Sequence, residues 1–553
     1  MSKTNSFLNG AHEVPPSRCR DEVSCCLMLT LVVVVVFLAG CARFEPKPIA
    51  PAQTAAEFEC RSLTNAALKT FLEKNLRREL TDWPHPQWDF DLLTLAAFYY
   101  HPDLAVARAQ WNVAQAGDKT AGGRPNPTLS LTPGFDATHN PGLSPWFPGL
   151  SFDLPLETAG KRGHRIAVAE QLSESARFNL AAVAWQIRGN LRTRLLDFTA
   201  AYERMELLQG QLSIQEQVAR LLGQQAEVGA IAKSELASRR VALQKAQLDL
   251  TDATSRVVEA RARVAEAVGI PQHAFDDAGL VLVPLKDFVA LGDLTSTEVR
   301  RAALQNRADI LGALADYAAS QATLQLEIAK QYPDVHLNPG YQFDQGDNKW
   351  SLGLTFELPI LNQNQGPIAE AAARRAEAAA KFNAVQAKAL AEIERATEIL
   401  KVTDENLATL QSLAEAQAQQ RESVEAQVKA GALEPLDLLN AKLEFASAQL
   451  VQLEGRVKFQ QAVAALEDAV QMPVALMSSN FPAVMGGTGV PPESVGTRPS
   501  LRTRVPTKRL PTPVFRETRK TTGATPVLPS GQPTADSKSS VIAPSPAMKE
   551  TKP

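Results

Sequence analysis

Two stretches of the chain alternate apolar and polar residues in the way that β-strands do. From 335 to 343 the odd positions are Val, Leu, Pro, Tyr and Phe, whereas the even positions are polar or glycine. The stretch 350–358 alternates in the same way, and so, less regularly, do 129–132 and 150–154. We expect strands of about 9–11 residues, the length that a tilted strand needs to cross a bilayer. A strand of a soluble β-sandwich would alternate too, so the pattern alone leaves that fold open.

Side chains at successive strand positions point to opposite faces, so the alternation divides each strand into two sets. We expect the apolar set to face lipid and the polar set to face a lumen. The lipid-facing set is Leu150, Phe152, Trp350, Leu352, Leu354 and Phe356, and the lumen-facing set is Ser151, Asp153, Ser351, Thr355 and Glu357. Four strands cannot close a barrel, and an open sheet edge in lipid leaves backbone groups unpaired. We therefore expect other copies of the chain to complete the sheet.

The sequence changes its period after each pair of strands. From 164 to 228, and again from 368 to 428, it is rich in Ala, Leu, Gln, Glu and Arg and contains no proline. About 60 helical residues would form a rod of about 90–100 Å, far longer than the globular mean of about 11–12 residues. Such helices are expected to be stable only in a coiled-coil or tubular assembly.

Strands and long helices together form a unit that occurs twice. The landmarks of 125–271 recur in 333–473, including the turn at Gly229, which corresponds to Gly431. The period of about 200 residues is far longer than that of solenoid repeats, about 20–50 residues. The expected fold class is mainly α with a membrane β-barrel, built from a duplicated strand–strand–helix–turn–helix unit. The expected segments are a lipoprotein signal peptide (1–40), an N-terminal periplasmic segment with short helices (41–100), a first repeat (101–271), a linker with a short helix (272–307), a second repeat (308–473) and a disordered tail rich in Pro, Thr, Ser and Lys (474–553).

The N-terminus resembles a secretory signal. Two arginines precede an apolar stretch, 27–38, that is too short to span a bilayer. The stretch runs into Leu-Ala-Gly followed by Cys41, which resembles a bacterial lipobox, so we expect the thiol of Cys41 to carry a covalent lipid. A plain signal peptide that happens to contain a cysteine is the alternative. Ala42 stands where an aspartate would favour retention at the inner membrane, which indicates the outer membrane.

Composition and motifs argue against several classes of function. The chain has a formal net charge of −3 and five cysteines without disulfide or zinc spacing, and we expect no nucleic-acid partner, no metal site and no resident cofactor. The sequence has no phosphate-binding, nucleophile-elbow or zinc-protease motif, so we expect it not to be an enzyme. Glu157 and Lys161 resemble an acid–base pair, but charged residues are expected where strands leave a membrane.

Several short motifs together resemble the TolC-type outer-membrane efflux family. They are Arg124-Pro125-Asn126-Pro127, Leu154-Pro155-Leu156 with Gly160-Lys161-Arg162 after it, the lipobox, and the paired turns at Gly229 and Gly431. The resemblance covers 89–473. Within the family, 101–127 and 157–162 are most similar to the CzcC-like lipoproteins that serve heavy-metal exporters, although the sequence has no cluster of Met or His that would mark a metal path.

The resemblance implies an exit channel that substrates cross passively. Three copies of the chain would form a homotrimer, in which twelve strands close a barrel and the helices continue it as a periplasmic tunnel. A periplasmic adaptor protein and an inner-membrane pump, of RND type, would deliver the substrate, with heavy-metal cations as one candidate class. The protein would lie in the outer membrane of a Gram-negative bacterium, in contact with its lipid, and would extend into the periplasm.

The resemblance also assigns a role to the two helical tips. Their surfaces, formed by Val228, Gly229 and Ala230 and by Ala430, Gly431 and Ala432, would dock the adaptor. The simpler interpretation is that each glycine forms an ordinary helix C-cap. The glycines would have this role in part even if the tips also dock an adaptor. Two other functions remain open: a lipid-anchored periplasmic coiled-coil scaffold or adaptor, and a lipoprotein that tethers peptidoglycan through its basic tail.

Overall fold

The structure, a computed structural model, describes residues 44–85, 87–137, 145–276, 281–282 and 296–473. The predicted signal peptide, Cys41 and the predicted tail lie outside these residues. The described residues all belong to one unit of the chain, 1–491. No helix in the described ranges combines the length and the apolar composition that crossing a membrane requires.

Each repeat contains a helix, two strands, a very long helix, a turn and a returning helix. The helices are α5 (Pro102–Ala121), α6 (Lys161–Glu227) and α7 (Lys233–Val268) in the first repeat, and α10 (Ala308–Ala329), α11 (Gln365–Lys429) and α12 (Pro435–Val470) in the second. With 67 and 65 residues, α6 and α11 confirm the two predicted long helices. The predicted unit began with a strand, whereas the structure adds α5 and α10 in front of the strands.

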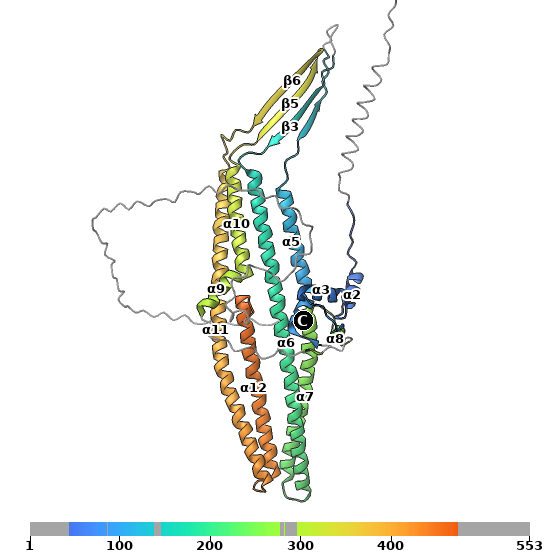
Figure 1. The fold of residues 1–553 in the computed structure, drawn as a ribbon, viewed down its shortest axis with the longest axis vertical. Helices are drawn as coiled ribbons and strands as arrows, with labels where there is room; N and C mark the ends of the chain where they lie inside the picture. Colours follow the sequence, from blue (N-terminus) through green and yellow to red (C-terminus); the bar gives the residue numbers. More distant parts are fainter. Residues whose placement is uncertain (1–43, 86, 138–144, 277–280, 283–295, 474–553) are drawn as a thin grey trace, which may run out of the picture. The chain divides into compact units, whose positions relative to one another are not determined.

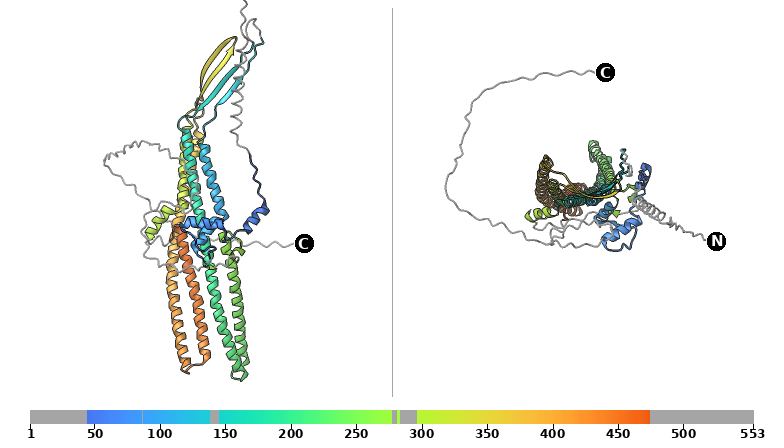
Figure 2. Two further views of the ribbon diagram at one scale, coloured as in Figure 1. Left: turned by 45° about the vertical axis from the view of Figure 1, so that its right-hand side comes forward. Right: turned by 90° about the horizontal axis from the view of Figure 1, so that it is seen from above.

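The helices lie side by side in two tiers that share α6 and α11 (Figure 1 and Figure 2). Near the sheet, α6 contacts α5 and α10, and α10 contacts α11. Toward the turns, α6 contacts α7 and α12, and α12 contacts α11. The order is therefore α5–α6–α10–α11 in the first tier and α7–α6–α12–α11 in the second, where α7 and α11 are the outermost helices.

Four strands form one antiparallel sheet beyond the first tier (Figure 1). They are β2 (Thr128–Thr132), β3 (Gly149–Leu156), β5 (Val335–Asp344) and β6 (Asp347–Phe356), in the spatial order β2-β3-β5-β6. The turn between β5 and β6 consists of Gln345 and Gly346, whose positive φ angles of 52° and 99° suit a two-residue turn of type I′. Within the described chain, the outer edges of β2 and β6 have no partner strand.

The strands differ from the prediction in two respects. β5 and β6 have ten residues each, within the predicted length, but β2 has five and β3 has eight. Pro127 and Pro133 flank β2 and lack the N–H that a ladder needs, which explains why it is short. Glu357 was predicted to face the lumen from within a strand. β6 ends at Phe356 because its partner strand begins at Val335, so Glu357 follows the strand instead.

The N-terminal segment packs against the middle of the first repeat. α3 (Ala66–Leu76) and α4 (Phe90–Tyr100) share an apolar core with α5, α6 and α7. The remaining elements are α2 (Pro51–Glu59), β1 (Gln87–Trp88), α8 (His273–Asp276), β4 (Val281–Leu282), which pairs with β1, and α9 (Ser296–Asn306). α9 packs on α11 and α12. Because the core includes the start of α5 and the end of α7, it joins the two tiers.

Candidate functional site

One face of the sheet is mainly apolar. The register places Leu150 beside Tyr341 and Tyr341 beside Trp350, and farther along it aligns Leu154, Leu337 and Leu354. The predicted apolar set, Leu150, Phe152, Trp350, Leu352, Leu354 and Phe356, therefore shares one face. Leucine, tryptophan and phenylalanine side chains on it are open to solvent in the single chain, with Trp350 80% exposed and Leu352 69% exposed. An exposed apolar surface of this extent calls for an apolar environment.

The opposite face is polar. Ser151, Asp153, Ser351 and Thr355 lie on it, as predicted from their parity, together with residues of β5. His336 Nδ1 lies 2.9 Å from the carboxylate oxygen Oδ1 of Asp153, and Asn338 Nδ2 donates a hydrogen bond of 2.9 Å to Thr355 Oγ1. This face therefore carries groups that water can solvate, whereas the opposite face carries mainly apolar side chains.

The joint between β3 and α6 is held by pairs that the sequence did not suggest. Lys161 Nζ donates to Asp334 Oδ1 at 2.8 Å, and the backbone N–H of Thr158 donates to the same oxygen at 3.0 Å. Glu157 forms an ion pair with Arg165 and not with Lys161. Glu157 and Lys161 therefore do not form an acid–base pair, and each is held by a partner outside the pair.

The two helical tips share one backbone motif. Gly229 and Gly431 have φ angles of 75° and 73°. The N–H of Ala230 donates to Gln225 O at 2.8 Å, and the N–H of Ala432 donates to Gln427 O at 2.9 Å, the six-to-one bond of a Schellman cap. A Cβ added at either glycine would meet no atom within 4 Å, so backbone conformation and not crowding requires glycine there.

Both tips present small residues to solvent. All six residues that were predicted to dock an adaptor are exposed, and Val228 is 80% exposed. Behind the tips, Val218 and Leu222 of α6 pack against Leu439 of α12, so the two hairpins contact each other through a small apolar cluster. α12 begins with a capping box between Glu434 and Asp437, whereas α7 begins without a side-chain cap. The structure thus fixes the two tips side by side.

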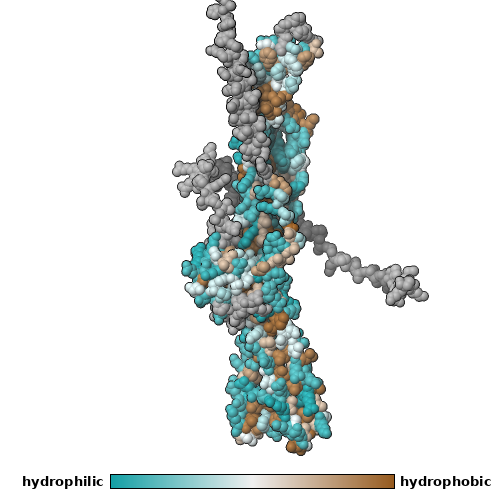
Figure 3. All heavy atoms as spheres, turned by 90° about the vertical axis from the view of Figure 1, so that its right-hand side faces the viewer, coloured by the Kyte–Doolittle hydropathy of each residue, from teal (hydrophilic) through white to brown (hydrophobic). Residues whose placement is uncertain are grey.

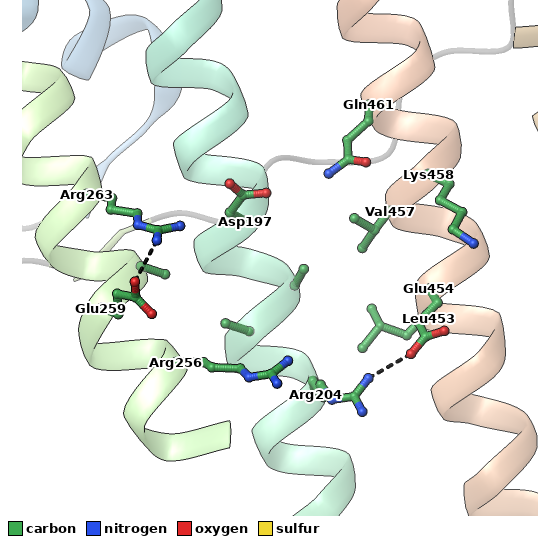
Figure 4. A pocket seen from close by; sticks show the side chains of 13 residues that line it. Asp197, Arg204, Arg256, Glu259, Arg263, Leu453, Glu454, Val457, Lys458 and Gln461 are labelled. Carbon is green, nitrogen blue, oxygen red and sulfur yellow. Dashed lines mark hydrogen bonds and ion pairs between the residues drawn. The ribbon is translucent and has the colours of Figure 1, made fainter. Parts of the chain in front are cut away.

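A groove of about 460 Å³ lies between α6, α7 and α12 (Figure 4). Ala200 and Ala201 of α6 line it, and charged side chains line it from all three helices. Arg204 pairs with Glu454 at 2.8 Å, and Arg263 pairs with Glu259 at 2.6 Å, as the dashed lines in Figure 4 show. Opposite charges therefore compensate one another along the groove.

A second group of charges fixes the end of α12. Glu467 pairs with Arg192 and, at 3.2 Å, with Arg188, both on α6. Arg307, just before α10, donates to Glu392 of α11 at 2.9 Å and to the carbonyl oxygen of Ala469 at 2.7 Å. The end of α12 is thereby tied to both long helices.

Asp468 lies next to this group of charges. Burial of the carboxylate raises the pKa of Asp468 to about 6, although Arg192 and Arg188 favour its charged form. The residue as a whole is exposed to solvent in the single chain. Among the described residues, no three His, Cys, Asp or Glu side chains come together as a group that could hold a metal ion.

The family described as Outer membrane efflux protein matches residues 97–270 and 299–470, the greater part of the chain. The chain belongs to the outer membrane efflux protein family. The two matched ranges contain the two repeats, each with its strands, long helix and tip.

Named relatives and a solved structure agree with this membership. The chain is 28% identical over 218 residues to the cobalt-zinc-cadmium resistance protein CzcC of Cupriavidus metallidurans. The matched residues make up 39% of this chain and 50% of CzcC. It is 25% identical over 308 residues to the nickel-cobalt-cadmium resistance protein NccC of Alcaligenes xylosoxydans xylosoxydans. These residues make up 55% of this chain and 68% of NccC. The chain thus spans about half the length of CzcC. Its fold is similar to that of the outer-membrane channel OprN, with a TM-score of 0.57 at 19% identity over 78% of this chain and 98% of that one.

Proposed function

We propose that the chain is one subunit of the outer-membrane exit channel of a tripartite efflux system. The observation that carries this proposal is the sheet, which has one exposed apolar face, one polar face and two open edges. Lipid would cover the apolar face and water the polar one. Substrates would pass through passively, because the sequence contains no nucleotide-binding motif.

The open edges support a ring of copies. Unpaired backbone groups cannot remain exposed to hydrocarbon, so β6 of one chain would pair with β2 of the next. Three chains would close a twelve-stranded barrel, an even number like that of bacterial outer-membrane barrels. The protein would then act as a homotrimer, with Ser151, Asp153, Ser351 and Thr355 facing the lumen.

The outermost helices of the second tier support the same ring. Each carries an exposed stripe of residues spaced alternately by four and three positions, the spacing of a coiled-coil seam. The stripe on α7 is Ala237, Val241, Gln244, Leu248, Thr251, Ser255 and Val258, and the stripe on α11 is Ile399, Val402, Asn406, Thr409, Leu413 and Ala416. Val241 is 65% exposed and Val402 is 54% exposed in the single chain. Packing α7 of one copy on α11 of the next would bury both stripes and continue the barrel as a helical tunnel.

The tips would dock the periplasmic adaptor. Two identical Schellman caps, each followed by a small residue, Ala230 or Ala432, leave room for another helical hairpin to approach closely. An inner-membrane pump of RND type would supply the substrate and the energy through that adaptor. The names of CzcC and NccC, which refer to cobalt, zinc, cadmium and nickel resistance, favour heavy-metal cations as the substrate class.

The N-terminus would add a lipid anchor. A diacylglycerol attached to Cys41 would hold the chain in the outer membrane before the barrel assembles. We expect no resident cofactor besides this lipid and no catalytic activity.

Expression of the full chain in a metal-sensitive strain, together with its own pump and adaptor, tests the proposal. We expect trimers in purified outer membranes that resist heating, ion conductance in planar bilayers, and metal resistance that disappears when the gene of the chain is deleted. A lipid-anchored coiled-coil scaffold or adaptor would share the helical stripes but would not need the apolar sheet face. A protein that washes off membranes once its lipid is removed, and that gives no conductance, would support the scaffold and contradict the channel.

A further inference from the structure

Four residues that follow β6 form an exposed apolar segment, Leu358-Pro359-Ile360-Leu361. Leu358 is 63% exposed, Ile360 is 74% exposed and Leu361 is fully exposed. Exposed leucine and isoleucine side chains are common singly, but a contiguous group of them marks an interaction surface.

The segment has a fixed position. Its beginning is continuous with β6, which pairs along its whole length with β5. Its end is held by Asn364, whose Nδ2 donates to the carbonyl oxygen of Glu327 at 2.7 Å and to the Glu327 carboxylate at 3.0 Å. These bonds tie the segment to the end of α10.

The corresponding residues of the first repeat are Leu154-Pro155-Leu156-Glu157, because 151–157 and 355–361 are equivalent in the duplication. Leu154, Pro155 and Leu156 belong to β3 and pair with β5. Leu358, Pro359 and Ile360 lie beyond β6, where no strand among the described residues pairs with them. The next position differs as well, because Glu157 forms an ion pair with Arg165 whereas Leu361 is fully exposed.

The segment begins where the apolar face of the sheet ends. Phe356, Leu358 and Ile360 have the same parity as Leu352 and Leu354. The last pair of the hairpin joins Val335 to Phe356, so the segment lies just beyond the base of the sheet, where Tyr332 is also 60% exposed. Figure 3 shows brown, hydrophobic atoms gathered where the sheet meets the helices.

We propose that residues 358–361 form a membrane collar: an apolar surface that inserts into the periplasmic leaflet of the outer membrane, at the depth of the headgroups and upper acyl chains. The inference rests on the proposed channel function. Lipid is the occupant favoured by continuity with the apolar face, and the nearby Tyr332 has the amphipathic ring that prefers the membrane interface. The collar would set how deeply the barrel sits.

Site-specific fluorescence in vesicles tests the collar. An environment-sensitive fluorophore is attached to Leu361→Cys, on a Cys60→Ser background, in full-length trimers reconstituted into phosphatidylcholine vesicles. The vesicles carry a nitroxide either on the headgroup or deep in the acyl chain, and iodide is added as an aqueous quencher. Leu354→Cys serves as the membrane-embedded control, Leu433→Cys near a helical tip serves as the periplasmic control, and the Cys60→Ser parent measures background labelling.

We expect the fluorophore at position 361 to lose most emission to the headgroup nitroxide, and the one at position 354 to lose most to the deep nitroxide. The one at position 433 should respond to iodide alone. Protection of position 361 from all quenchers, with position 354 still quenched by lipid, would assign the segment to contact with another copy of the chain and overturn the collar. Quenching of position 361 by iodide alone would overturn it too. If position 354 were quenched only by iodide, the membrane sheet itself would be wrong, so failure of the collar and failure of the channel give different results.

Discussion

Arginine at Leu352 should prevent stable assembly of the barrel, whereas arginine at the adjacent Ser351 should not. The two residues are neighbours in β6 and therefore lie at nearly the same depth. Leu352 is paired with Pro339 on the apolar face, and Ser351 is paired with Gly340 on the polar face. The comparison separates the effect of the face from the effects of depth, strand and side-chain size.

The geometry of β6 sets the magnitude. Its ten residues, at about 3.3 Å each, make a strand of about 33 Å. At a tilt of about 40° the strand spans about 25 Å, the height of the apolar band of an outer-membrane barrel. Leu352, the sixth residue of β6, lies near the middle of that band. Arginine there should cost about 2–4 kcal/mol per chain, so about 6–12 kcal/mol per trimer, if the three sites act independently.

Depth provides a second control. Leu358→Arg has the same parity but lies beyond the end of the strand, at the edge of the membrane, where arginine costs about 0–1 kcal/mol. Urea titration of trimers folded into vesicles, followed by the shift in gel mobility between folded and heated samples, measures the free energy of unfolding. We expect a large loss for Leu352→Arg and small changes for Ser351→Arg and Leu358→Arg. Equal losses at positions 351 and 352 would refute the assignment of the two faces.

Three further predictions concern the lipid, the tips and one carboxylate. Cys41→Ala should abolish labelling by a radioactive fatty acid and leave an unprocessed precursor, and labelling that persists would contradict lipid attachment at Cys41. Ala230→Glu or Ala432→Glu should impair metal efflux at unchanged trimer abundance. Each charge should also weaken crosslinks to the adaptor from cysteines placed at these tips. Normal efflux in the charge variants, together with no crosslink from the cysteine variants, would mean that the tips are helix caps only. Because the pKa of Asp468 is about 6 in the folded chain against 3.8 for an ordinary aspartate, the folded state binds the proton more tightly, so stability should fall as pH rises from about 4 to 6. Asp468→Asn should remove that decline and stabilise the protein at pH 7 by about 1 kcal/mol per chain, a figure reduced for the solvent exposure of the side chain, and a urea titration of both proteins at pH 4 and pH 7 that shows no difference would contradict the shifted pKa.

The long helices and the strand faces could be predicted because each depends on a local pattern. The absence of proline from 164–228 and 368–428 allowed helices of 67 and 65 residues, and period-two alternation was sufficient to divide β5 and β6 into faces. The short β2 was missed because alternation was given more weight than the prolines on either side of it. Helices α5 and α10 lie within the predicted ranges of the two repeats, but the predicted strand–strand–helix–turn–helix unit did not include them.

The ion pairs could not be predicted because they join residues that are distant in sequence. Lys161 and Asp334 are 173 positions apart, and Arg192 and Glu467 are 275 positions apart. Nothing in the local pattern around an arginine on a long helix says which carboxylate will reach it, since that depends on how the two repeats pack. Glu157 and Lys161 resemble an acid–base pair in sequence, but each has its partner elsewhere, at Arg165 and at Asp334.

Duplication of the hairpin within one chain has a consequence for symmetry. The tips at Gly229 and Gly431 have nearly the same backbone geometry, but the helices that follow them differ, since α12 begins with a capping box and α7 does not. A ring of three chains would therefore present six tips that alternate between two kinds, with approximate sixfold and true threefold symmetry. A partner built from six equal subunits could occupy every tip, yet its neighbouring subunits would meet different chemistry. Mutations at one kind of tip would then affect every second subunit of the partner. Three of the six contacts would be weakened, while the other three would still hold the partner in place.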